Sequence, residues 1–174
     1  MKNIAASINR NHHACIYQLR LLLMLMIPAL LMQPCTVSAD SAAVYSKTVD
    51  KSVEAIYPVL YKSLEEARFF VVFEPNIGQN IAAFAERWGE DYNRNRLDEI
   101  RSMVFCNGWY ANQVSNLDPQ MLGFCPLHLT LTERAGKTTV LFNRPTVTAK
   151  DSPAFELFTE LESEVIKAIE AGLQ

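Results

Sequence analysis

Residues 127–143 read LHLTLTERAGKTTVLFN, and this stretch is the clearest indication of the fold class. Leu127, Leu129 and Leu131 alternate with polar residues, and this period of two is typical of a strand with one buried face. Residues 133–137 are polar or small and predict a turn, after which residues 138–143 return as the partner strand. The stretch therefore predicts an antiparallel β-hairpin.

The segment that follows the hairpin predicts a long amphipathic helix at the C-terminus. Ser152 is the expected N-cap, Pro153 occupies the first helical position, and Gly172 is expected to end the helix. One apolar stripe recurs at helical spacing, formed by Phe155, Phe158, Leu161, Val165 and Ile169. Such a helix covers one face of a sheet.

The region before the hairpin alternates between strands and helices. Residues 44–50 predict a strand, and a helix follows that is capped by Asp50 or Ser52 and carries Pro58 inside it. Residues 68–74 contain a run of aromatic and β-branched residues, which predicts a strand buried on both faces. A short helix capped by Asn80 is expected next, before Gly89.

The centre of the chain carries a dense run of alternating charges over residues 90–101. We interpret this run as a solvated loop or exposed helix, with a binding loop as the alternative. A short strand over residues 103–106 and a helix or irregular crossover over 109–122 follow. The predicted order is β-α-β-α-β-α-β-β-α, so we expect a single α+β domain with a mixed or antiparallel sheet packed against helices.

The first 39 residues have the pattern of a signal peptide. They contain no Asp or Glu and carry three basic residues, and residues 21–32 form an apolar run too short to span a bilayer. Cleavage after about Ala39 would leave residues 40–174 as the mature domain, with no membrane attachment. The alternatives are an uncleaved anchor and a lipoprotein processed at Cys35. We expect a periplasmic or secreted bacterial protein.

The composition of the mature chain excludes several classes of function. Residues 40–174 hold 13 Lys and Arg against 19 Asp and Glu, a net charge of −6, and an acidic domain is a poor partner for nucleic acid. His128 is the single histidine of this region. The sequence contains neither a Gly-x-Ser-x-Gly nucleophile motif nor a Gly-rich phosphate-binding loop. Hydrolase chemistry therefore has little support, and we expect no cofactor.

Two cysteines remain after cleavage, Cys106 and Cys125. In an oxidising compartment a disulfide between them is the simplest expectation, and the alternatives are two free buried thiols or a functional thiol pair. With His128 the two thiols could also form a soft metal or haem site. Against that site, residues three apart on a strand point to opposite faces.

The sequence around the cysteines also carries a family resemblance. The residues concerned are Phe105-Cys106-Asn107, Ala111, Leu117-Asp118-Pro119, Leu122-Gly123-Phe124 and Cys125. Together with the order of the flanking elements, this pattern resembles the domain-of-unknown-function 302 family over about residues 44–172. The resemblance implies a small α+β domain that tends to form a homodimer and has no established activity.

Taken together, these patterns favour a non-enzymatic domain that binds a small ligand or a protein partner. The candidate binding residues lie at the strand ends near the cysteines: Cys106, Asn107, Trp109, Cys125 and His128. The alternative function is a thiol-based redox or metal- or haem-binding protein that uses Cys106 and Cys125. The sequence does not identify the ligand or the partner.

Overall fold

The computed structural model describes residues 43–174. The predicted leader and its cleavage site after Ala39 lie outside the described residues.

Five strands form one sheet in the order β1-β5-β4-β3-β2, and every neighbouring pair is antiparallel. The strands are β1 (Val44–Val49), β2 (Phe70–Phe73), β3 (Glu99–Cys106), β4 (Leu127–Arg134) and β5 (Lys137–Asn143). The predicted hairpin is confirmed, because β4 and β5 pair around a turn at Ala135 and Gly136. Both turn residues have positive φ, 51° and 72°, and glycine adopts such angles readily.

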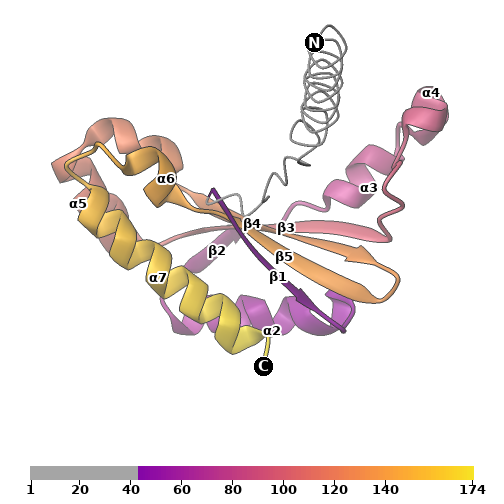
Figure 1. The fold of residues 1–174 in the computed structure, drawn as a ribbon, viewed down its shortest axis with the longest axis horizontal. Helices are drawn as coiled ribbons and strands as arrows, with labels where there is room; N and C mark the ends of the chain where they lie inside the picture. Colours follow the sequence, from indigo (N-terminus) through magenta and orange to yellow (C-terminus); the bar gives the residue numbers. More distant parts are fainter. Residues whose placement is uncertain (1–42) are drawn as a thin grey trace, which may run out of the picture. The chain divides into compact units, whose positions relative to one another are not determined.

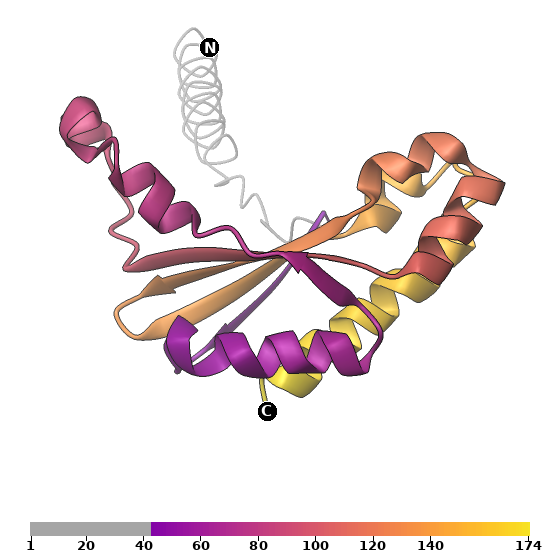
Figure 2. The same ribbon diagram turned by 180° about the vertical axis from the view of Figure 1, so that it is seen from behind.

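Two long helices, α2 (Val53–Glu66) and α7 (Phe155–Gly172), pack against each other and cover one face of the sheet (Figures 1 and 2). The core lies between these helices and the sheet, and it includes Phe158, Leu161, Val165 and Ile169 of the predicted stripe. Of the two N-caps proposed for α2, Ser52 is the one used: its side chain accepts a hydrogen bond from the Ala55 N–H.

The helices α2 and α7 contact each other closely near the C-terminus of the chain. Gly172 is the last residue of α7, and a Cβ atom there would lie 3.1 Å from Cα of Leu60. The Ser63 hydroxyl donates a 2.6 Å hydrogen bond to the carbonyl of Ala168. Gly172 therefore allows the two helix backbones to approach each other.

Shorter helices extend beyond the two ends of the sheet. They are α3 (Ile77–Ala82), α4 (Ala85–Trp88), the 3₁₀ turn η1 (Gly89–Asp91), α5 (Gly108–Leu117), the 3₁₀ turn η2 (Pro119–Phe124) and α6 (Pro145–Ala149). In Figure 1, α3 and α4 lie beyond one end of the strands, and α5 and α6 beyond the other. The α+β prediction is confirmed, with α6 as an element that we did not predict.

The strand predicted over residues 68–74 is present as β2, but the prediction that both its faces are buried is wrong. β2 is an edge strand, with a neighbour on one side only. Phe70, Val72 and Phe73 are 53%, 62% and 63% exposed. We call these three residues the apolar edge.

Two predicted helix starts are also wrong. Asn76, not Asn80, caps α3, and its Oδ1 accepts a hydrogen bond from the Gln79 N–H at 2.8 Å. Ser152 lies in a turn before α7, where its hydroxyl accepts from the Ala154 N–H, and the helix begins at Phe155. The charged run over 90–101 is likewise not all loop or helix, because β3 begins at Glu99.

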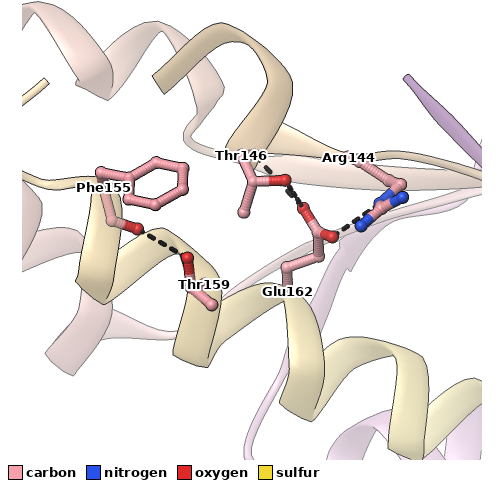
Figure 3. Close-up of polar contacts among 5 residues, drawn as sticks. All are labelled: Arg144, Thr146, Phe155, Thr159 and Glu162. Carbon is pink, nitrogen blue, oxygen red and sulfur yellow. Dashed lines mark hydrogen bonds and ion pairs between the residues drawn. The ribbon is translucent and has the colours of Figure 1, made fainter. Parts of the chain in front are cut away.

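A buried carboxylate joins the end of β5 to α7. Glu162 is 4% exposed, and its Oε1 lies 2.7 Å from Nε of Arg144 (Figure 3). The hydroxyl and the N–H of Thr146 both donate to its Oε2, at 2.5 and 3.2 Å. These partners lie at the start of α6, where Arg144 is the N-cap residue and Thr146 is in the first turn, so they hold the start of α6 against the long helix.

Candidate functional site

The end of β3 positions Cys106. The preceding residue, Phe105, is fully buried in the core, so alternation along the strand directs Cys106 to the opposite face of the sheet. Cys106 pairs with Phe70 of the apolar edge and is half-buried. The thiol thus lies on the face that α2 and α7 leave uncovered.

The next candidate residues begin α5. Asn107 is the N-cap of this helix, and its Oδ1 accepts hydrogen bonds from the N–H groups of Trp109 and Tyr110. Its side-chain oxygen therefore stabilises the helix start. Trp109 is 56% exposed and packs edge-on against Tyr110, whose hydroxyl donates to Glu160 at 2.9 Å.

Cys125 lies between η2 and β4, half-buried and joined to Pro126 by a cis peptide bond. Burial raises the pKa of the Cys125 thiol, and the electrostatic effect of the neighbouring Cys106 raises it further. A raised pKa lowers the fraction of thiolate, which is the nucleophilic and metal-binding form. Both cysteines are free thiols in the structure, and the disulfide stays a prediction.

His128 lies on the exposed side of β4, directly opposite Val104 of β3. Because Val104 and Cys106 are two residues apart on one strand, His128 and Cys106 share the uncovered face of the sheet. Among residues 43–174, no group of three or more His, Cys, Asp or Glu side chains is arranged to hold a metal ion.

A cavity of about 220 Å³ opens beside this cluster. It is lined by Gly123, Phe124, Pro126, Leu127, His128, Phe142 and Asn143. We call it the strand-end cavity. Of the five candidate residues, His128 lines it, and both neighbours of Cys125 do so as well. Cys106, Asn107 and Trp109 are outside its lining.

Sequence reasoning missed most of this cavity. Phe142 and Asn143 end β5, whereas Phe124 and Pro126 flank Cys125 in the turn before β4. The pairing of β4 with β5 brings these distant segments together. A usable signal was present, because the predicted hairpin places residues 127–129 beside residues 142–143.

No helix within residues 43–174 combines the length and apolar character that crossing a membrane requires.

Comparisons with known proteins agree with the fold. A crystal structure of an uncharacterised conserved DUF302 protein from Bacillus stearothermophilus matches with a TM-score of 0.63 and 19% identity, over 74% of this chain and 96% of that one. At this identity the likeness shows the fold alone. A comparison with curated proteins finds no match. The model of the family described as "Domain of unknown function DUF302" matches residues 45–172, so the chain belongs to the DUF302 family.

Proposed function

We propose that this domain is a non-enzymatic binding module that takes a small ligand in the strand-end cavity. The observation that carries the proposal is the cavity itself, which lies beside Cys125 and includes His128 in its lining. Ligand pockets are concave and mostly apolar, with a few polar groups that orient the ligand. Its residues match that description.

The lining residues define the class of ligand. Phe124, Leu127 and Phe142 are apolar, while His128 and Asn143 carry an imidazole and an amide. None of the lining residues is Lys, Arg, Asp or Glu. The volume is below the range of about 300–1,000 Å³ typical of drug-sized ligands. The expected ligand is therefore a small, uncharged, largely apolar molecule with one hydrogen-bonding group.

Phenol is a suitable probe for this site, because it combines an aromatic ring with one hydroxyl. Titration into ¹⁵N-labelled protein should shift the amide signals of residues 124–128 and 142–143 and saturate. His128→Ala should weaken binding about threefold to tenfold, as expected for the loss of one hydrogen bond. Thr132→Ala, on the same strand but outside the cavity, is the matched control. Shifts centred elsewhere, or equal binding by both variants, would contradict the proposal.

The proposed setting is the bacterial periplasm. The supporting feature is the leader over residues 1–39, with its basic start, short apolar run and small residues before Asp40. An acidic domain with two cysteines is compatible with this compartment, where disulfides persist.

The proposed partner is a second copy of the chain, with the apolar edge at the interface. β2 carries no charged residue, whereas the opposite edge strand, β1, contains Lys47. Uncharged apolar edges associate readily, and two copies would bring no like charges of β2 together. Because Glu65 Oε1 already accepts the Val71 N–H at 2.9 Å, side chains rather than a continuous backbone ladder would form the contact.

A further inference from the structure

A larger cavity, of about 370 Å³, lies at the other end of β3. Its lining consists of Asn76, Gly78, Gln79, Ile81, Ala82, Tyr92, Asn93, Leu97, Asp98, Glu99 and Ile100. We call it the α3 cavity, because residues of α3 line one side and residues of the segment returning from η1 to β3 line another. It shares no lining residue with the strand-end cavity.

The walls of the α3 cavity are fixed by close contacts. A Cβ atom on Gly78 would lie 3.1 Å from the backbone nitrogen of Ile100, so α3 approaches β3 at a distance that favours glycine. Asn93 accepts a hydrogen bond from the Leu97 N–H at 2.9 Å and donates one to the Leu97 carbonyl at 2.8 Å. These contacts hold the returning segment in one shape, and a preformed wall lowers the entropic cost of binding.

The protein also holds the side chain of Asp98, through one of its two carboxylate oxygens. Its Oδ2 accepts a 2.7 Å hydrogen bond from the Ala135 N–H in the β4–β5 turn, and its own N–H donates to the Glu133 carbonyl at 2.8 Å. Within residues 43–174 Asp98 takes part in no ion pair. The turn therefore orients this carboxylate without neutralising it.

The charge of the lining distinguishes among ligand classes. It includes two carboxylates, Asp98 and Glu99, and no Lys, Arg or His. The cation paired with Glu99 is Arg101, at a loose 3.9 Å, and its guanidinium stacks over the ring of Tyr57. An anionic ligand would meet the carboxylate of Asp98, which has no ion-pair partner within residues 43–174, whereas a cation would find a charge partner there.

We propose that the α3 cavity binds a small organic cation, with an ammonium group at Asp98 and an aliphatic chain along Ile81, Leu97 and Ile100. These three residues and Tyr92 supply apolar surface for the chain, and an aromatic ring also attracts a cation. A metal ion fits less well, because adjacent residues on an extended segment project to opposite sides, so Asp98 and Glu99 do not converge on one point. On this proposal, part of the charged run over residues 90–101 would act as the binding loop that the sequence offered as an alternative.

The test uses two probes of nearly the same shape, n-butylammonium chloride and butan-1-ol, titrated into the ¹⁵N-labelled domain. Butylammonium should give saturable shifts for amides in residues 77–82 and 92–100, and butan-1-ol should bind at least about fivefold more weakly, as expected for the loss of a charge-assisted hydrogen bond. Added salt should weaken the binding of butylammonium and leave the binding of butan-1-ol unchanged, because only butylammonium is charged.

Asp98→Asn removes the charge and retains an oxygen that can accept the Ala135 N–H. It should weaken butylammonium binding about fivefold while leaving phenol shifts at the strand-end cavity unchanged. Asp151→Asn, an exposed carboxylate outside the cavity, is the matched control. Equal binding of the two probes, shifts outside the α3 cavity, or an Asp98→Asn variant that binds normally would each overturn the proposal. Because the two cavities have separate signals and probes, failure at one is distinguishable from failure at the other.

Discussion

Nε of Arg144 lies 2.7 Å from Oε1 of Glu162, and the two side chains differ greatly in exposure. The arginine side chain is 39% exposed, whereas the glutamate side chain is 5% exposed. The carboxylate thus depends on protein partners for compensation, while the guanidinium remains partly hydrated. Removing the arginine should therefore destabilise the fold more than removing the glutamate, because it leaves a buried charge without compensation.

Arg144→Met should therefore lower the free energy of unfolding by about 2 kcal/mol, because it leaves the buried Glu162 with Thr146 as its remaining partner. The double variant Arg144→Met/Glu162→Met should recover part of this loss, since apolar residues can replace a buried pair. Urea denaturation of each variant measures the effect. Lys167→Met breaks an exposed pair with Glu164 and is the control, with an expected change below about 0.5 kcal/mol. An Arg144→Met variant as stable as this control would contradict the argument.

Local patterns were sufficient to predict the elements that build the core. The period of two over residues 127–143 and the helical stripe of α7 both reflect burial of one face, and both are present in the structure. Local reasoning was wrong for β2, because a run of Phe and Val indicates a strand without indicating which of its faces other elements cover. That coverage depends on the position of the strand in the sheet, here at the edge, which these residues do not encode locally.

The candidate site was predictable only in part for a similar reason. The sequence does not show which strands are neighbours, and it is the pairing of β3 with β4 that places the segments of Cys106 and Cys125 at one end of this strand pair. The strand-end cavity also requires Gly123 and Asn143, which no local sequence pattern marks as parts of one site, because they reach the cavity only through the fold of the chain. Glu162 was missed too, since a glutamate in a helix is read as exposed unless its partner on another segment is known.

The stability of the domain should depend on pH through Glu170. The Tyr45 hydroxyl donates to Glu170 at 2.5 Å, and this hydrogen bond, with a smaller contribution from Lys47, lowers the pKa of Glu170. A carboxyl group with a lowered folded-state pKa adds stability above its ordinary pKa of 4.5. That contribution is lost as the pH falls from 4.5 through the lowered value.

Thermal unfolding of the parent protein and Glu170→Gln, measured from pH 7 to pH 3, tests this dependence. The parent should have the higher Tm at neutral pH, and the difference should narrow below pH 4.5 as Glu170 is protonated. Glu156→Gln changes an exposed carboxylate near the other end of α7 and should not show this narrowing. A difference in Tm that stays constant with pH would mean that Glu170 acts through packing and not through its charge.

The proposed homodimer is tested by a change in the apolar edge. Phe73→Lys adds a charge to a side chain that is already 63% exposed, so the fold should be retained while association is weakened. Analytical ultracentrifugation should give a dimer for the parent and a monomer for the variant. Val147→Lys, an exposed apolar residue of α6, should leave the dimer intact. A monomeric parent, or a dimer that tolerates Phe73→Lys, would place the interface elsewhere or remove it.

The two cysteines and the leader can be tested in one measurement, the intact mass of the protein isolated from the periplasm and alkylated without reduction. Cys106 ends β3 and Cys125 comes shortly before β4, its antiparallel neighbour, so the two segments are adjacent. In an oxidising compartment we expect a chain that starts at Asp40, carries no alkyl group and lacks the two thiol hydrogens. A disulfide between Cys106 and Cys125 should stabilise the domain by about 3 kcal/mol on the chain-entropy model, and urea denaturation with and without a reductant would measure this difference.

Two alkyl groups on the periplasmic protein would instead show free thiols, and would favour the thiol-based alternative over the structural disulfide. A mass that retains residues 1–39 would contradict the signal peptide.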